Sequence, residues 1–444
     1  MTSTDWHERV SRLAFDPSAA SEAARHFERV ERVFDERFAG SAPTRAWWVP
    51  GRIEVLGKHT DYGGGRSLLA AVGRGFHWLA APLTDGRIEI VDARTGAACD
   101  IPLSADIPHR PGHWSNYVIS VARRIARDFP GVRTGMRAVF SSSLPKSAGL
   151  SSSSALVVST FLPLAAFNRL DDHSAWQQNV PDRPALAGYF GAIESGRAFA
   201  RFPADHGVGT HGGSEDHAAI LCCRAGRLSV YRFLPVTHEG DVVLPAGWTF
   251  AIAISGVHAS KTGAVRDHYN RLATEMARLT TMWREGTGRD DESLLSAIES
   301  GSGALDWLRT IVAAGPDGST LLPRLDQFAA ESTEIIPGVV ERLAAGDVDG
   351  VGPLVDRSQR LAEDTLTNQV PETIALVRTA RELGAAAASA FGAGFGGAVW
   401  ALVRRDELAD FLDRWHAAHL ARHPASGANA EFFSSDPASA AMEL

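Results

Sequence analysis

The sequence has little of what marks a secreted, membrane-spanning or nucleic-acid-binding protein. It contains three cysteines, of which two are adjacent (Cys222 and Cys223) and cannot easily bridge each other, so the chain has no disulfide framework. No run approaches ~20 apolar residues, and no basic segment leads into an apolar one at the N-terminus. The net charge of −8 argues against a general nucleic-acid binder. We therefore expect a cytoplasmic protein with neither a membrane nor nucleic acid as partner.

The length of the chain predicts two domains. A single core normally stops growing before 444 residues. Strand-like patterns dominate the first half and helical patterns the second, with Pro, Gly and acidic residues between 235 and 247. We expect an α+β protein with a β-rich domain at 1–240 and a helix-rich domain at 241–444. Within it, we predict a buried strand at 218–223 and helical patterns at 293–313 and 321–344.

Four consecutive serines, Ser151 to Ser154, follow Gly149 and Leu150 at a predicted helix start. A strand is expected to end near Phe140, and a helical pattern covers 156–167. The hydroxyls and the first N–H groups of that helix can hold an anion, and glycine allows close approach of the backbone. Phosphate is the obvious guest, although a plain helix cap gives the same pattern.

Two nucleotide-binding signatures fail on context. The segment from Gly51 to Lys58 resembles a P-loop but has one residue too many, and His59 stands where Ser or Thr binds Mg²⁺. The segment from Gly392 to Gly397 satisfies G-x-G-x-x-G, which would indicate a dehydrogenase, but an apolar strand follows it instead of a helix. A tight hairpin turn, or backbone lying close to a ligand, fits these glycines better.

Three motifs together resemble the small-molecule kinases of the GHMP superfamily. Pro50–Gly65, Lys146–Ala155 and Phe391–Val399 occur in the order and at the separations seen in that family. The first is similar to the galactokinase signature P-G-R-hydrophobic-x-hydrophobic-hydrophobic-G-x-H-T-D-Y-x-G-G, and Trp114–Val118 resembles its W-x-N-Y-V segment. The resemblance implies a GHMP kinase fold with the active site in the cleft between two domains. It also implies transfer of phosphate from ATP, with Mg²⁺, to the anomeric 1-hydroxyl of a monosaccharide.

The resemblance implies that Arg52 and Asp216 are catalytic. In the family, the arginine of P-G-R and the aspartate of G-x-x-D-Q lie beside the phosphorylated hydroxyl. Here Gly213–His217 matches that segment, with His217 replacing glutamine. Asp216 would accept the hydroxyl proton or orient the nucleophile, while Arg52 lowers its pKa and balances phosphoryl charge. On residue type alone, Arg52 would be a surface ion pair and Asp216 a helix or turn cap.

The remaining family positions fall into three groups. ATP is expected at Trp114, Lys146, Gly149, Leu150, Ser151, Ser152, Ser153, Ser154, Gly394 and Gly396, and Mg²⁺ at Ser152 and Glu194. The sugar is expected at Lys58, His59, Asp61, Gly64 and Tyr269. Lys146 could equally be an exposed loop lysine, and Glu194 a solvated helix residue.

Lys58 departs from the family, which has a glutamate that bonds to the primary hydroxyl of the sugar. An ammonium favours an anionic group, so one hypothesis is a uronic acid substrate. Alternatively, Lys58 pairs with Glu54 and galactose is still accepted. A different alternative is a non-catalytic sensor of sugar and ATP. We expect a monomer or a weak homodimer.

Overall fold

The computed structural model describes residues 5–13, 15, 17–41, 44–146, 148–257, 263–392 and 394–444. Ser147 of the serine stretch and Ala393 of the glycine run lie outside these ranges. Within these ranges, no helix combines the length and the apolar character that crossing a membrane requires.

The first half of the chain is built on a large, mostly antiparallel sheet. Its strands are β1 (Arg45–Leu56), β2 (Arg66–Leu83), β3 (Arg87–Asp92), β4 (Ala98–Pro102), β5 (Gly135–Ser142), β6 (Arg227–Arg232), β7 (Thr237–Val243) and β12 (Met442–Glu443). The order is β12-β1-β2-β5-β3-β4, with β6 also paired to β2 and β7 to β6. The pair of β3 with β5 is parallel. β1 is buried along almost its whole length, because helices cover both faces of the sheet.

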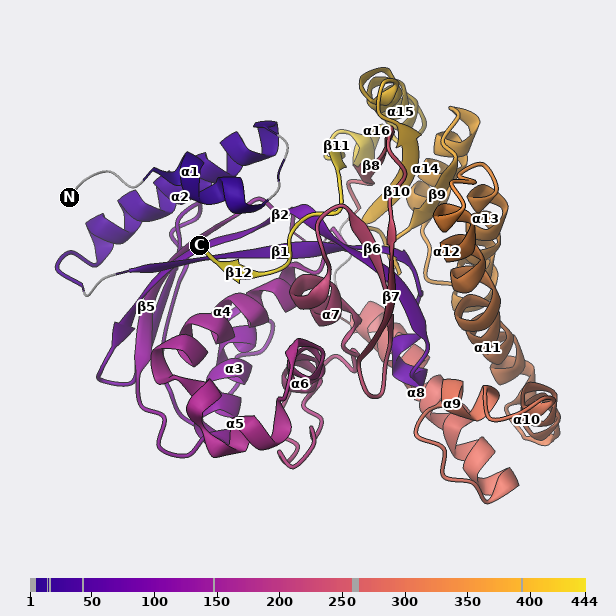
Figure 1. Ribbon diagram of the computed structural model, residues 1–444, viewed down its shortest axis with the longest axis horizontal. Helices are drawn as coiled ribbons and strands as arrows, with labels where there is room; N and C mark the ends of the chain where they lie inside the picture. Colours follow the sequence, from indigo (N-terminus) through magenta and orange to yellow (C-terminus); the bar gives the residue numbers. More distant parts are fainter. Residues whose placement is uncertain are drawn as a thin grey trace.

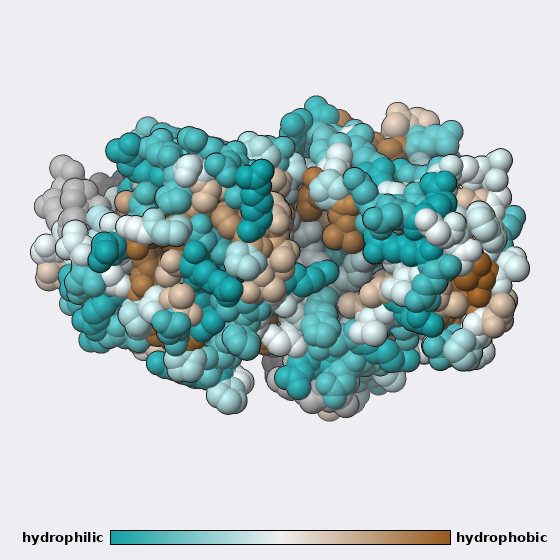
Figure 2. Space-filling model, turned by 90° about the horizontal axis from the view of Figure 1, so that it is seen from below, coloured by the Kyte–Doolittle hydropathy of each residue, from teal (hydrophilic) through white to brown (hydrophobic). Residues whose placement is uncertain are grey.

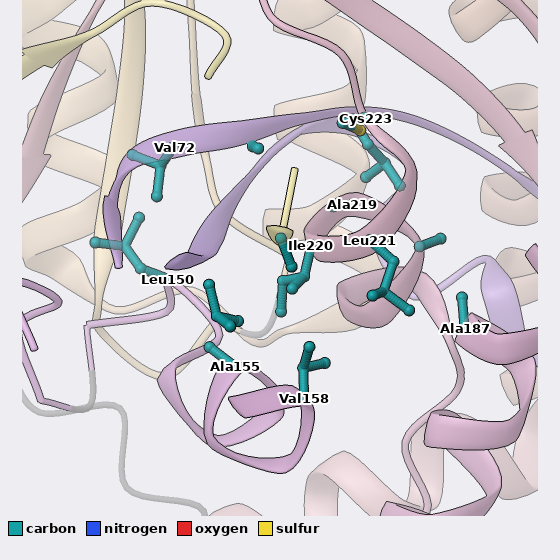
Figure 3. Close-up of a cluster of buried hydrophobic side chains, with 14 of the residues drawn as sticks. Val72, Leu150, Ala155, Val158, Ala187, Ala219, Ile220, Leu221 and Cys223 are labelled. Atoms are coloured by element: carbon teal, nitrogen blue, oxygen red, sulfur yellow. The ribbon is translucent and has the colours of Figure 1, made fainter. Parts of the chain in front are cut away.

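Helices cover the two faces of this sheet in separate groups (Figure 1). α1 (Trp6–Val10) and α2 (Pro17–Arg37) lie on one face, and α2 packs on β2 and β5. The other face carries α3 (Ser115–Asp128), α4 (Ser152–Asn168), α5 (Ser174–Asn179), α6 (Arg183–Ser195) and α7 (Glu215–Cys222). α4 is apolar on all sides, which is typical of a buried helix. Figure 3 shows side chains of α4, α6 and α7 in the same buried cluster as Val72 of β2.

The second half contains a smaller antiparallel sheet with helices packed around it. Its strands are β8 (Trp248–Ile254), β9 (Ala387–Ala390), β10 (Ala398–Arg404) and β11 (Glu431–Ser435), in the order β11-β8-β10-β9. The helices are α8 (Gly263–Thr287), α9 (Leu294–Ile298), α10 (Ala304–Ala314), α11 (Gly318–Ala330), α12 (Ile336–Ala344), α13 (Val351–Leu361), α14 (Pro371–Glu382), α15 (Leu408–Arg422) and α16 (Pro424–Gly427). Figure 2 shows a mostly hydrophilic face that is hollowed between the two halves.

One local prediction was wrong, and two helical ones were confirmed with an irregularity in each. The apolar run 218–223 belongs mainly to helix α7, because a short apolar run fits a buried helix as well as a strand. The pattern 293–313 is split into α9 and α10 by turns around Gly301 and Gly303. The pattern 321–344 is helical throughout, and it includes a π-helical turn, η4 (Glu331–Ile335), whose Glu331 is buried.

The boundary placed at residue 240 lies inside β7, which still pairs with β6 of the large sheet. The smaller sheet begins at Trp248, and β12 returns to the large sheet beside β1. That residues 1–240 and 241–444 form separate domains therefore stays a prediction.

Candidate active site

Strand β1 brings Arg52 against the serine loop, the segment 146–154. Arg52 donates from its backbone N to the Leu150 carbonyl over 3.3 Å and from a guanidinium nitrogen to the Gly149 carbonyl over 3.1 Å. Gly51 makes this approach possible, because a Cβ at that position would overlap the Leu150 carbonyl oxygen. At the P-G-R motif, the backbones of β1 and the serine loop thus lie in close contact, and this contact fixes the position of the buried Arg52.

Arg52 is surrounded by carboxylates. Its Nε donates to Asp216 Oδ1 over 2.6 Å, its second terminal nitrogen lies 3.1 Å from Glu54 Oε2, and Glu215 lies 3.9 Å away. Burial works against the charge of Arg52, but the carboxylates of Asp216, Glu54 and Glu215 outweigh it and raise the pKa of the guanidinium. Arg52 is therefore a permanent cation held in one orientation.

Two cavities meet at Arg52 and Asp216. One, of about 520 Å³, has an apolar wall that includes the aromatic rings of Phe76, Trp114 and Phe140. The other, of about 40 Å³, is lined by polar side chains from β1, α4, α6, α7 and α8. Arg52 and Asp216 line both. A group bound in the larger cavity can therefore reach a group bound in the smaller one at this pair.

The serine loop forms the polar end of the large cavity. Lys146, Gly149, Ser151, Ser152 and Ser153 all line it. Ser151, the residue before α4, has a left-handed backbone (φ 61°) and makes no side-chain capping bond. The first N–H groups of α4 consequently have no cap from this residue and face the cavity end, where an anion can accept from them. Together with the aromatic wall, this cavity has the features that a nucleotide with its phosphates requires.

The small cavity is lined by polar side chains of the galactokinase-like signature. His59 Nδ1 lies 3.0 Å from Tyr62 Oη, and the ring of Tyr269 on α8 stands edge-on to His59 at a centroid distance of 5.4 Å. Asp61 accepts from the backbone N of Glu215, while burial raises the pKa of its carboxyl to about 6. These groups offer several hydrogen-bond partners in an enclosed space, as recognition of a polyhydroxylated ligand requires.

Family models match three stretches of the chain. "Galactokinase galactose-binding signature" matches residues 32–82, "GHMP kinases N terminal domain" matches 116–194 and "GHMP kinases C terminal" matches 339–421. The chain belongs to the GHMP kinases.

Relatives of this GHMP kinase span nearly its whole length. A galactokinase of Chloroflexus aggregans is 26% identical over 87% of this chain and 91% of the relative, and one of Lacticaseibacillus paracasei is 25% identical over 94% and 98%. A crystal structure of Lactococcus lactis galactokinase complexed with galactose superposes with a TM-score of 0.74 at 22% identity, covering 93% of this chain and 98% of that one. This last likeness shows that the kinase has the same fold.

Oxygen donors suited to a metal ion converge at the junction of the two cavities. Ser154 Oγ lies 2.9 Å from Glu194 Oε2 and 3.3 Å from Asp216 Oδ2. Mg²⁺ takes oxygen ligands and is typically held by one or two carboxylates plus substrate phosphates, so these residues fit the ion. The serine hydrogen-bonded to Glu194 is Ser154, whereas the predicted Ser152 lines the large cavity.

Lys58 lies away from the small cavity, in contrast to its predicted role. Its side chain is 1% exposed, and Nζ donates to Ser389 Oγ over 2.7 Å and to Ser358 Oγ over 3.3 Å. Ser358 in turn donates to Glu331, which also accepts from the backbone N of Gly57. The ammonium is therefore committed to a buried network behind the signature loop. Neither the uronic acid hypothesis nor a Lys58–Glu54 pair has support in this geometry.

The described glycines of the run lie between the antiparallel strands β9 and β10, which confirms the expected hairpin turn and speaks against the dehydrogenase alternative. Gly392 lines the small cavity, and Gly397 packs on Gly149 of the serine loop. The predicted Gly394 and Gly396 instead shape the turn, against Asn368 and Val257 respectively.

Two further predicted residues, Gly64 and Leu150, pack against residues around the site. Gly64 packs on Ser293 and the Phe233 carbonyl, and Leu150 contributes its carbonyl to Arg52 while its side chain lies in the core (Figure 3).

The sequence reasoning missed two acidic residues of the small cavity, Glu54 and Glu215. Glu54 stands two positions after Arg52 on β1 and so shares its face, a signal that the alternation of strand side chains provides. Glu215 precedes Asp216 in the first turn of α7. His217, in place of the family's glutamine, places Nε2 3.2 Å from Glu194.

Proposed function

We propose that this GHMP kinase transfers the γ-phosphoryl group of ATP to the anomeric 1-hydroxyl of a monosaccharide, with galactose as the reference substrate. The observation that carries the proposal is the Arg52–Asp216 pair, at 2.6 Å, where the two cavities meet. A phosphate donor in the large cavity and a sugar in the small one would have their reacting groups on either side of this pair.

The chemistry follows from the charges at that junction. Asp216 Oδ2 is turned towards Ser154 and the small cavity, where a sugar hydroxyl can donate its proton to the carboxylate as its oxygen attacks phosphorus. The bond from phosphorus to the bridging oxygen breaks, and ADP leaves. Arg52 remains charged throughout and stabilises the negative charge that spreads over the transferring oxygens.

Ser154 and Glu194 are the residues that would hold Mg²⁺, which when bound would neutralise charge on the phosphates. Trp114 and the serine loop would hold the nucleotide. The small cavity has a volume of about 40 Å³, and Tyr62, Tyr269 and the Gly212–Gly213 segment form part of its lining.

A non-catalytic sensor is the alternative, and the intact Arg52–Asp216 pair disfavours it. ADP release, coupled to a second enzyme and measured with a panel of monosaccharides, tests the proposal. We expect ADP release that depends on a sugar. Binding of ATP and sugar without ADP release would contradict a kinase and support the sensor. The 1-position is tested by the loss of the reducing end in the product, and the monomer or weak dimer by sedimentation.

A further inference from the structure

The small cavity holds more carboxyl groups than its cations balance. Five carboxyl side chains line it: Glu54, Asp61, Glu194, Glu215 and Asp216. Among the described lining residues, Arg52 is the one side chain with a permanent positive charge. The ammonium of Lys58 lies in the network behind the loop and bonds to serines there. A metal at Ser154 and Glu194 would offset charge at one end of the cavity and leave the other end acidic.

Most of these carboxyl groups have donors from the protein. Asp216 accepts from Arg52, Glu194 accepts from Ser154, and Asp61 accepts from the backbone N of Glu215. In the described part of the chain, the carboxyl oxygens of this cavity that lack a hydrogen-bond donor therefore belong to the remaining two side chains, Glu54 and Glu215.

Glu54 and Glu215 form a carboxyl pair with too few donors. Oε2 of Glu54 contacts Arg52, and Oε2 of Glu215 accepts from Ser67 over 3.0 Å. The Oε1 atoms of both residues are buried without a protein donor in the described part of the chain, and the side chains are 3% and 6% exposed. Burial and the nearby charge of Glu54 raise the pKa of Glu215 well above its ordinary value. A cation placed between the two groups would relieve this repulsion.

The backbone fixes the position of this pair. Gly392 lies against the Glu54 carboxylate so closely that a Cβ there would overlap it. Glu215 stands in the first turn of α7, next to Asp216, where the positive end of the helix dipole favours a carboxylate. The two acceptors are therefore held at one wall of the cavity, beside the Arg52–Asp216 pair.

We propose that Glu54 and Glu215 select a monosaccharide that carries a positively charged amino group, so that the kinase prefers amino sugars to neutral and anionic ones. The inference rests on the proposed kinase function and names its substrate class. An ammonium supplies three N–H donors and a positive charge to two acceptor groups, whereas a hydroxyl supplies one donor and no charge. A uronate would add a further carboxylate to an acidic cavity.

The test compares three sugars of one configuration: the amino hexose, its N-acetyl derivative and the neutral hexose. ADP release is measured below the pKa of the amine. We expect kcat/KM for the amino hexose to exceed the other two by about tenfold or more, the range of a hydrogen bond to a charged group. Glu54→Gln and Glu215→Gln should each lower this ratio, and Glu341→Gln on the surface of α12 should leave it unchanged.

The ratio of kcat/KM values for two sugars is measured on one protein preparation. An inactive, unfolded fraction lowers both values equally, so the ratio stays valid for a variant that folds incompletely. A neutral hexose used as well as every amino hexose would overturn the inference, as would ratios that the two glutamine variants leave unchanged. If no sugar releases ADP, the proposed kinase function fails separately. Calorimetric binding of the same sugars then decides the inference, and equal affinity for the amino and neutral sugars overturns it.

Discussion

Arg52 Nε donates to Asp216 Oδ1 over 2.6 Å, and within the described residues these two side chains are the ones that line both cavities. One comes from β1 and the other from α7, which lie far apart in the sequence. The strong charge-assisted hydrogen bond between them holds the guanidinium and the carboxylate in a fixed relative position. Predictions about the kinase follow from this pair and from the groups that hold it in place.

Lys58 is expected to act in folding and not in sugar recognition. Lys58→Met leaves Glu331 buried without the ammonium that lowers its pKa against the effect of burial. Lys58 and Glu331 interact through Ser358, so we expect the free energy of unfolding to fall by about 3 kcal/mol, the low end of the cost of breaking a buried charge pair. Urea denaturation monitored by tryptophan fluorescence gives the value.

The matched variant for this prediction removes both charges. Lys58→Met combined with Glu331→Gln should recover a large part of the stability, because no unpaired charge then remains. A Lys58→Met protein of unchanged stability but altered KM for the sugar would show instead that Lys58 contacts the substrate.

Ser154, and not Ser152, is expected to set the requirement for magnesium. Ser154→Ala removes the hydroxyl next to Glu194 and Asp216 and should raise the Mg²⁺ concentration for half-maximal activity about tenfold. Ser152→Ala, in the neighbouring cavity, should act mainly on the KM for ATP. Magnesium titrations of the two variants at saturating ATP distinguish these effects. The reverse pattern would assign the metal to Ser152.

Asp61 is expected to make stability fall as the pH rises. Burial raises its pKa from 3.8 to about 6, so the folded protein binds more protons than the unfolded chain between these values. Stability is therefore lost as the pH rises through that window, and the full cost, on the order of 2–3 kcal/mol, is present at pH 7.

Asp61→Asn should accordingly raise the free energy of unfolding at pH 7, reduce its decrease between pH 4 and 6, and raise the KM for the sugar. Glu215 and Glu331 are shifted in the same direction and should keep part of the decrease. Urea denaturation at pH 4.5 and pH 7 provides the comparison. If Asp61→Asn loses as much stability between pH 4.5 and pH 7 as the original protein does, the assignment to Asp61 is refuted.

Gly51 is expected to tolerate no side chain. In Gly51→Ala, the added methyl group overlaps the Leu150 carbonyl and displaces the serine loop, so we expect kcat/KM for ATP to fall about a hundredfold. Gly73→Ala is the control, because the nearest atom to its Cβ would be Ser435 Oγ at 3.4 Å, an ordinary contact. Steady-state kinetics of both variants test the prediction, and equal losses would contradict it.

The sequence predicted the chemistry of the site better than its geometry. The serine motif indicated an anion site because its glycine, its hydroxyls and the helix start depend on local backbone chemistry, whereas Arg52 was indicated by the resemblance to the family. The direction of the Lys58 side chain depends on Ser358, Ser389 and Glu331, which are some three hundred residues away in the sequence. Local patterns carry no information on such contacts.

The large and small sheets show the same limit. Long strands with β-branched and aromatic residues, such as β1 and β2, were predicted from alternation and composition. The apolar run that forms α7 has the pattern of a buried strand, because a helix that is buried on all sides lacks the periodicity of an amphipathic helix. As a result, the position of Glu215 beside Glu54 in the small cavity was not predicted.

The most direct test of the account is phosphoryl transfer by Asp216→Asn. Asparagine keeps the size of the side chain but cannot accept a proton as a carboxylate does, so kcat for ADP release should fall by about 10²–10⁴-fold. ATP should still bind, with an affinity by calorimetry close to that of the original protein, because the serine loop and Trp114 are untouched. The account predicts lost turnover with retained ATP binding. Near-normal turnover in this variant would contradict it.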